Sequence, residues 1–133
     1  MEKHLLFVYG TLKSGFWNHH YLEDSEYLGK AETKEKYAMY VGGIPFVVKG
    51  QKVSTIKGEV YEVSKDVLKE IDRLEGHPFA YRREKVKVKL EDGKEVEAWM
   101  YFWRNNVEAS TLNPEGEYIS ESFRRERQQQ AVM

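Results

Sequence analysis

Hydrophobic and polar residues along the chain alternate in short segments that are typical of β-strands separated by turns. Lys3 to Val8 ends in an apolar run, and Thr55 to Val63 places β-branched and aromatic residues at its apolar positions. Two further strands are expected at Glu32 to Tyr40 and at Pro45 to Val48, on either side of a glycine pair. The pattern therefore predicts a sheet built from short strands.

The spacing of apolar residues changes to a helical period after Val63. The following apolar residues then share one helical face: Val67, Leu68, Ile71 and Leu74. Ser64 is suited to cap the N-terminus of this helix, and Gly76 is suited to end it. A second, shorter helix is expected within Phe16 to Gly29, where Trp17, Tyr21 and Leu22 have compatible spacing.

A β-hairpin is expected over Arg83 to Trp103, and its register follows from a three-residue loop that ends with Gly93 in the left-handed conformation. In this register the following residues face each other: Lys89 and Glu95, Lys87 and Glu97, Val88 and Val96, and Val86 and Ala98. Opposite charges then meet on one face and apolar residues on the other. Further along, Trp99, Tyr101 and Trp103 occupy the polar face. We expect that face to be covered, either because the sheet closes into a barrel or because a helix packs over it.

These elements predict an α+β fold with a small, mostly antiparallel, curved sheet or barrel and flanking helices. With 133 residues, the chain has the size of one domain. We assign this domain to residues 1–112. Residues 113–133 are predicted to be a C-terminal extension, partly disordered, because they are polar with little periodicity.

Composition narrows the classes of protein to which the chain can belong. Hydrophobic residues make up 41% of the chain and the net charge is −1, as expected for a packed protein without a general attraction to nucleic acids or anionic membranes. The absence of cysteine excludes disulfides and thiolate nucleophiles. No apolar run is long enough for a signal peptide or a membrane span, so we expect a soluble, cytoplasmic protein. The sequence does not indicate an oligomeric state.

The turn after the first strand, Tyr9-Gly10-Thr11-Leu12, is the first candidate binding site. Gly10 has no Cβ and allows close approach to the main chain, and free N–H groups beyond a strand end can bind an anion or an oxyanion. An ordinary turn with Tyr9 packed inside is the alternative, since glycine is common in loops. The glycine patterns that bind nucleotide phosphates are absent.

Glu75 is the candidate catalytic residue because it directly follows the apolar face of the predicted helix. A carboxylate at a helix C-terminus meets the negative end of the helix dipole. If Glu75 points into the curved sheet, its pKa should rise into the range useful for proton transfer, and if it is solvated it is an ordinary surface charge.

Other candidate chemistry is less well supported by the sequence. The four histidines (His4, His19, His20 and His77) lack the spacing of a helical metal site, so neither a metal nor another cofactor is expected. The basic run from Arg82 to Lys89 is interpreted as a solvated face, because the predicted hairpin pairs two of its lysines with glutamates. A serine nucleophile is not expected, since the chain has no G-x-S-x-G sequence.

Four segments in this order resemble the gamma-glutamylcyclotransferase-like family: "FVYGTLKSG", "IKGEVYEV", "IDRLEG" and "YRRE". Within the family, the chain looks most like the gamma-glutamylaminecyclotransferase branch. The resemblance implies a small antiparallel barrel flanked by helices. It also implies that Tyr9, Gly10, Thr11 and Leu12 bind substrate and that Glu75 is the catalytic carboxylate. Tyr81 and Arg83 belong to the matching segment, and either can line the pocket or brace it.

The resemblance further implies the reaction, in which a gamma-glutamyl amide cyclises to 5-oxoproline and releases an amine. Formally this is an aminoacyltransferase without a protein nucleophile or cofactor, and its partner is the small-molecule substrate. Two alternatives remain at this stage. The fold can serve as a non-catalytic small-molecule binding or interaction module, or as an RNA-binding barrel that uses its exposed aromatic residues.

Overall fold

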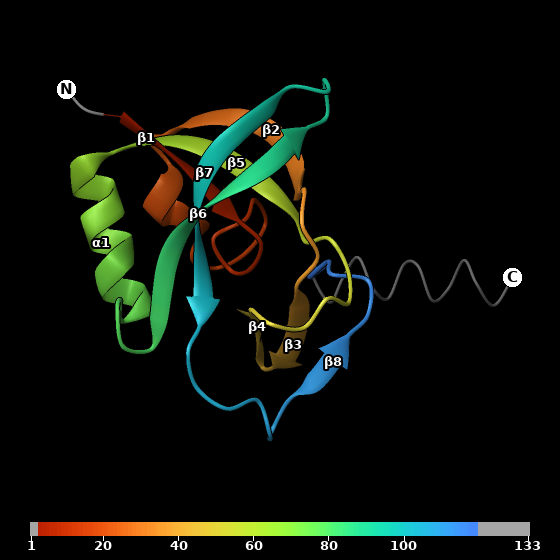
Figure 1. Ribbon diagram of the computed structural model, residues 1–133. Helices are drawn as coiled ribbons and strands as arrows, with labels where there is room; N and C mark the ends of the chain where they lie inside the picture. The colour runs from red at the N-terminus through yellow and green to blue at the C-terminus, as the bar shows by residue number, and fades with distance from the viewer. Residues whose placement is uncertain (1–2, 120–133) are drawn as a thin grey trace, which may run out of the picture.

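Five strands close into a barrel with the hydrogen-bonded order β1-β5-β2-β6-β7. The computed structural model describes residues 3–119, and Figure 1 shows the barrel strands beside the single α-helix. These strands are β1 (Lys3–Val8), β2 (Glu26–Thr33), β5 (Lys57–Ser64), β6 (Tyr81–Leu90) and β7 (Glu95–Trp103). Neighbouring strands are antiparallel except β1 and β7, which pair in parallel at Leu6 and Trp99. The predicted α+β fold with a mostly antiparallel, curved sheet is confirmed.

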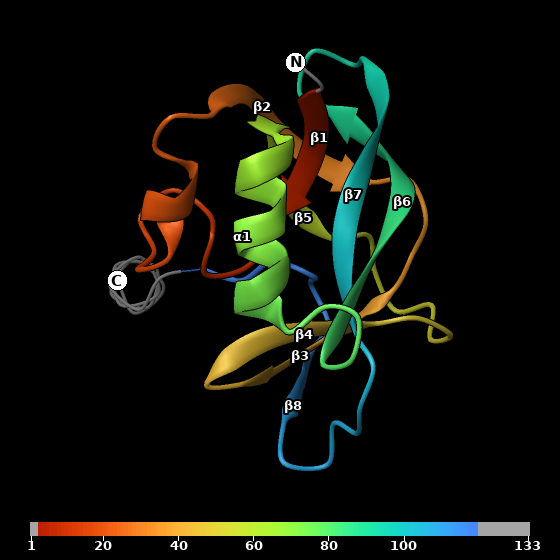
Figure 2. The same ribbon diagram turned by 90° about the vertical axis from the view of Figure 1, so that its left-hand side faces the viewer.

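A second sheet of three strands lies at one end of the barrel (Figures 1 and 2). Its strands, in the order β4-β3-β8, are β3 (Ala38–Gly42), β4 (Ile44–Val48) and β8 (Thr111–Asn113). Gly43 joins β3 to β4 with a φ of 82°, a conformation that glycine adopts without strain. Because β4 packs against β7, this sheet covers the barrel end toward which β1 runs.

The β6–β7 hairpin has the predicted register, including the pairs Lys89–Glu95 and Val88–Val96. Gly93 has a φ of 91°, as its place in the loop requires. The interior residues of the hairpin pack with the core inside the barrel. The opposite face is covered, since Tyr101 is 4% exposed and packs in a second cluster with Leu68 and Ile71 of the helix. Both expected forms of cover occur, a closed barrel and a packed helix.

Helix α1 (Lys65–Glu75) begins and ends where the sequence predicts. Ser64 Oγ accepts a hydrogen bond from the Val67 N–H at 3.2 Å, and Gly76 ends the helix in the left-handed conformation with a φ of 65°. Figure 2 shows α1 lying along the outside of the barrel, where it contacts β1 and β5. These two strands and the helix therefore fix where Glu75, at the helix end, is placed.

The predicted strand from Glu32 to Tyr40 is wrong, because the chain turns after Thr33 and starts a new strand, in the other sheet, at Ala38. The buried Thr33 hydroxyl accepts the Ile56 N–H at 2.9 Å and donates to the Glu35 carbonyl oxygen at 2.7 Å. This side chain holds the turn that separates β2 from β3.

The short helix expected within Phe16 to Gly29 is a single 3-10 turn, η1 (His19–Leu22). Leu22 is buried, whereas Trp17 is 61% exposed and does not pack with it as the spacing suggested. The same segment also contains the start of β2 at Glu26, which was not predicted. Half of the β2 residues are exposed and the strand contains a bulge between Tyr27 and Gly29, so the sequence lacks a regular alternation along the whole strand.

The chain continues to pack against the barrel beyond β8. Tyr118 is 8% exposed and belongs to the barrel core, and the Gly116 carbonyl oxygen accepts the Lys57 N–H at 2.9 Å. Residues 120–133, most of the predicted C-terminal extension, lie outside the described residues. The division at residue 112 stays a prediction. Among residues 3–119, no helix is long and apolar enough to cross a membrane.

Candidate active site

A small cavity lies where the end of β1, the end of α1 and the tip of β4 meet. Its lining contains all six residues predicted to form the site: Tyr9, Gly10, Thr11, Leu12, Glu75 and Tyr81. The remaining lining residues are Phe7, Val8, Ile44, Pro45 and Tyr101. The cavity volume is about 40 Å³, which holds about one water molecule. The six predicted residues extend over 72 positions of the sequence, from Tyr9 to Tyr81, and the folded chain brings them together at this cavity.

Five lining residues were not predicted to belong to the site: Phe7 and Val8 of the first strand, and Ile44, Pro45 and Tyr101. Tyr101 had a usable signal, because it lies on the hairpin face that was expected to be covered. Ile44 and Pro45 had none, since their place at the cavity depends on the separate β4-β3-β8 sheet. Long-range packing of this kind leaves no trace in the local hydrophobic pattern.

Glu75 is the only ionisable carboxylate in the lining of this cavity. Its side chain is partly exposed and forms no hydrogen bond or ion pair with any residue from 3 to 119. Desolvation by burial raises the pKa of Glu75 from 4.5 to about 7. The group therefore exchanges a proton near neutral pH, as general acid–base catalysis requires.

Three tyrosines line the cavity with Glu75, and the hydroxyl group of each donates to an atom other than the Glu75 carboxylate. Tyr9 Oη donates to the Tyr101 carbonyl oxygen at 2.7 Å, and Tyr81 Oη donates to the Pro45 carbonyl oxygen at 3.1 Å. Burial, and to a smaller extent the negative charge of Glu75, raises the pKa of both phenols. Both tyrosines are therefore neutral and form part of the cavity wall. Neither hydroxyl group donates a hydrogen bond to the Glu75 carboxyl group.

The turn from Gly10 to Lys13 presents main-chain groups to the cavity. It is closed by the Lys13 N–H, which donates to the Gly10 carbonyl oxygen at 3.0 Å, and it is anchored by Asn18 Nδ2, which donates to Thr11 Oγ1 at 3.0 Å. Within residues 3–119, the N–H groups of Gly10, Thr11 and Leu12 have no acceptor. Unsatisfied donors beside a cavity can bind an anion or a developing oxyanion.

Gly10 also has a packing role that the sequence did not reveal. A Cβ atom added at this position would lie 2.8 Å from Pro45 Cγ, closer than two such carbons can approach. Glycine therefore lets β4 close directly over the turn. The ordinary-turn interpretation is right about Tyr9, which is 6% exposed and packed inside, but the same residue also lines the cavity.

A hydrogen-bonded ion pair fixes the last turn of α1 to the hairpin. Arg83 Nε lies 2.8 Å from Asp72 Oδ1, Arg83 Nη2 lies 3.1 Å from Oδ2, and Tyr101 Oη donates to Oδ1 at 2.6 Å. Burial alone would raise the pKa of Asp72, but the hydrogen bonds from Arg83 and Tyr101, together with the positive charge of Arg83 and the interaction with His77, lower it overall. Arg83 does not line the cavity and braces the helix end, whereas Tyr81 forms part of the cavity wall. Substrate binding by Tyr81 stays a prediction.

No group of three or more histidine, aspartate or glutamate side chains in the described part of the chain is arranged to hold a metal ion. His19 and His77 instead contact neighbouring main-chain groups, since His19 Nδ1 lies 3.0 Å from the Leu12 carbonyl oxygen and His77 Nδ1 accepts the Arg83 N–H at 3.2 Å. Both histidines therefore support the segments that line the cavity.

Comparison with known proteins identifies the family. The profile described as "Gamma-glutamyl cyclotransferase, AIG2-like" matches residues 6–120. A protein of Methanocaldococcus jannaschii named "Putative gamma-glutamylcyclotransferase" is 61% identical over 99 residues, which are 74% of this chain and 82% of that protein. "Gamma-glutamylaminecyclotransferase C" of Danio rerio is 35% identical over 130 residues and covers 85% of this chain and 83% of that protein.

A solved structure agrees with these sequence relatives. The crystal structure of an AIG2-like protein from Mus musculus matches with a TM-score of 0.82 and 28% identity, over 91% of each chain. The order of segments on which the resemblance was based, from the turn after β1 to the start of β6, lies within the matched residues. The chain belongs to the gamma-glutamyl cyclotransferase, AIG2-like family.

Proposed function

We propose that the protein cyclises a gamma-glutamyl amide to 5-oxoproline and releases the free amine, with Glu75 as general base and then general acid. The α-amine nitrogen of the substrate attacks its own γ-carbonyl carbon, and the amide C–N bond breaks. Glu75 takes a proton from the attacking amine and gives it to the leaving nitrogen. The reaction needs no protein nucleophile, because the substrate supplies its own.

The protonation state of Glu75 supports this role. A carboxyl group with an ordinary pKa is a poor base toward an ammonium group, whereas one with a pKa of about 7 is available in both forms at neutral pH. Because no side chain among residues 3–119 donates to it, its oxygens are available to a substrate amine. When substrate binds, its amine supplies the hydrogen-bond donor that the Glu75 carboxyl group lacks among residues 3–119.

The turn that lines the cavity together with Glu75 supports stabilisation of the transition state. Negative charge develops on the γ-carbonyl oxygen during attack, and the N–H groups of Gly10 to Leu12 are the unsatisfied donors at this cavity. A gamma-glutamyl group is larger than a water molecule, so the cavity must widen when substrate enters. Ile44, at the tip of the β3–β4 hairpin and 37% exposed, is the wall residue we expect to move.

The single observation that carries the proposal is one cavity lined both by a desolvated carboxyl group without a hydrogen-bond partner and by a turn with free main-chain donors. Its test is Glu75→Gln, which keeps the size of the side chain and removes the base. We expect release of 5-oxoproline from gamma-glutamyl amides to fall by about 100-fold or more. A panel of substrates with different leaving amines, including gamma-glutamyl-ε-lysine and glutathione, identifies the preferred amine.

Glu70→Gln is the matched control, because Glu70 is an exposed glutamate on the same helix. It should leave turnover within about twofold of the wild type, since exposed surface changes rarely matter. If Glu75→Gln retains near-normal turnover, Glu75 is not the base. If the wild-type protein binds gamma-glutamyl amides without releasing 5-oxoproline, the fold is a binding module and the enzymatic proposal is wrong.

A further inference from the structure

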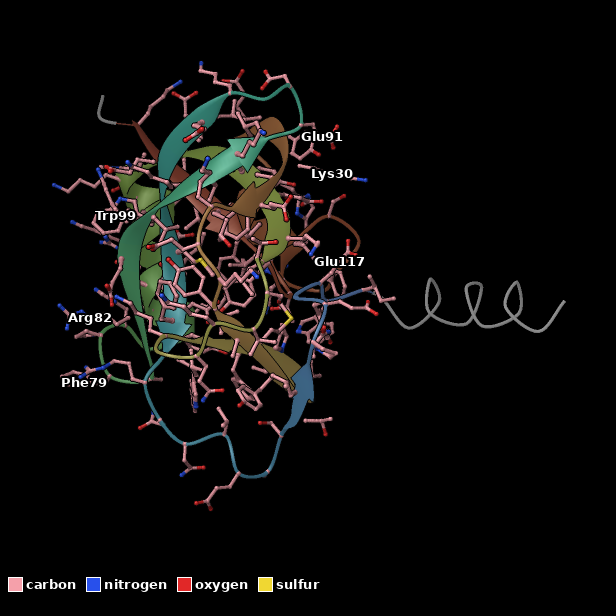
Figure 3. All side chains as sticks on the ribbon, turned by 45° about the vertical axis from the view of Figure 1, so that its right-hand side comes forward. Lys30, Phe79, Arg82, Glu91, Trp99 and Glu117 are labelled. Atoms are coloured by element: carbon pink, nitrogen blue, oxygen red, sulfur yellow. The ribbon has the colours of Figure 1, made fainter. Side chains whose placement is uncertain are left out.

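A second cavity of about 420 Å³ lies on a different part of the barrel, lined by β2, β5, the end of β6, the β6–β7 loop, the loop after β1 and the C-terminal segment. This volume falls in the range of small-molecule sites. Figure 3 shows the labelled side chains of Lys30, Glu91 and Glu117 on one side of the molecule, away from Arg82 and Trp99. The catalytic carboxyl group of the proposed function is not part of this lining.

Charged residues of both signs dominate this second cavity. Four lysines and four glutamates line it, and they form no ion pair with one another within the described residues. Exposed charges without partners are ordinary on a protein surface, where water solvates them. The second cavity differs because one of its lysines is almost completely withdrawn from water.

Lys13 is that residue, with a side chain that is 9% exposed. Its Nζ donates to the Tyr118 carbonyl oxygen and lies 5.5 Å from the centre of the Phe16 ring, but no carboxylate among residues 3–119 pairs with it. Desolvation lowers the pKa of Lys13, and the negative charges of Glu117 and Glu59 oppose this shift only in part. A buried ammonium group without a counter-ion is unfavourable, so an anion that reaches it gains a strong partner.

The glutamates of the cavity divide into two kinds. Glu59 Oε1 already accepts hydrogen bonds from the Ser14 N–H at 2.9 Å and from Tyr61 Oη at 3.1 Å, and Glu32 Oε2 accepts one from Thr55 Oγ1. The carboxylates of Glu91 and Glu117 accept none from residues 3–119. The cavity thus offers an unpaired cation at its buried end and unpaired carboxylates toward solvent, which is the charge distribution complementary to a zwitterion.

We propose that this second cavity is a binding site for a small zwitterion of the α-amino acid class, whose carboxylate pairs with Lys13 and whose ammonium group pairs with Glu117. Two complementary charges on one ligand satisfy both unpaired groups, whereas an anion or a cation alone satisfies one. The site does not depend on the proposed function, because neither Glu75 nor any other residue of the first cavity takes part in it.

Titrations followed by protein amide NMR test the site with three probes: L-alanine, acetate and methylammonium. We use the Glu75→Gln protein, so that binding is measured without turnover and independently of the proposed reaction. L-alanine should cause saturable shifts at residues of the second cavity such as Lys13, Lys30 and Leu90. Acetate and methylammonium should bind at least 10-fold more weakly, because each leaves one of the charged groups unpaired.

Lys13→Met should reduce the affinity for L-alanine at least 10-fold, while Lys36→Met, at an exposed lysine outside the cavity, should not. Because Lys13 is buried and its replacement can affect folding, Glu117→Gln provides a second variant, with Glu115→Gln as its exposed control. We expect Glu117→Gln to weaken L-alanine binding and to leave acetate binding unchanged.

Three results would overturn the assignment. The first is the absence of saturable shifts up to about 20 mM L-alanine, well above a millimolar dissociation constant. The second is equal affinity for acetate and L-alanine, which would indicate a simple anion site. The third is the location of the shifts around Tyr81 and Tyr101, which would place the ligand in the first cavity.

Discussion

At the scale of single residues, the buried carboxyl group of Glu75 carries a cost in stability. In the unfolded chain its pKa returns to the ordinary value of 4.5, whereas burial raises the pKa to about 7 in the folded protein. Folding therefore takes up a proton between these two values, and the free energy of unfolding falls as pH rises from about 4.5 to about 7. One pKa unit corresponds to about 1.4 kcal/mol, and partial exposure reduces the total to about 1–3 kcal/mol.

Glu75→Gln should remove this dependence on pH. Relative to the wild type, the variant should gain about 1–3 kcal/mol in its free energy of unfolding between about pH 4.5 and about pH 8, because glutamine does not ionise. Urea denaturation of both proteins across this range measures the difference, in which all other titrating groups cancel. A difference that stays constant with pH would show that Glu75 ionises as freely in the folded protein as in the unfolded chain.

At the scale of elements, the sequence predicted those features that depend on residues close together in the chain. The ends of α1 followed from Ser64 and Gly76, and the hairpin register followed from Gly93 and the charge pairs. The turn at Thr33 was missed because it depends on a hydrogen bond to Ile56, 23 residues away. Likewise, the turn and the carboxylate of the candidate site were found by motif, whereas Pro45 and its neighbours required the fold.

The ion pair between Arg83 of β6 and Asp72 fixes the end of α1, which carries Glu75, to the β6–β7 hairpin. Arg83→Met should lower the free energy of unfolding by about 1–3 kcal/mol, because it leaves the half-buried carboxylate of Asp72 with Tyr101 as its remaining partner and loses the stacking of Arg83 on Trp99 at 4.3 Å. It should also lower kcat for 5-oxoproline release, since the last turn of α1 loses its anchor.

Chemical denaturation and steady-state kinetics measure both effects of this replacement. Arg82→Met is the control, because Arg82 is the exposed neighbour on the same strand and should change stability by less than about 0.5 kcal/mol. Equal losses in the two variants would show that the general loss of positive charge matters, and not the contact with Asp72.

At the scale of the whole molecule, both cavities depend on segments that close the barrel from outside. The β4-β3-β8 sheet supplies walls of the first cavity, and the segment through Tyr118 supplies a wall of the second. The ring of Tyr118 stacks on Phe16 at 5.1 Å and lies in the barrel core, and its carbonyl oxygen accepts from Lys13. The folded unit should therefore extend beyond the predicted boundary at residue 112.

Tyr118→Ala tests this extension, because it empties a core position close to the end of the described chain. We expect the free energy of unfolding to fall by about 3 kcal/mol or more, as for other buried aromatic residues. Leu112→Ala, at a residue that is 40% exposed on β8, should cost less than about 1 kcal/mol. Similar small losses in both variants would mean that residues after 112 contribute little to folding, and the domain would then end where the sequence pattern fades.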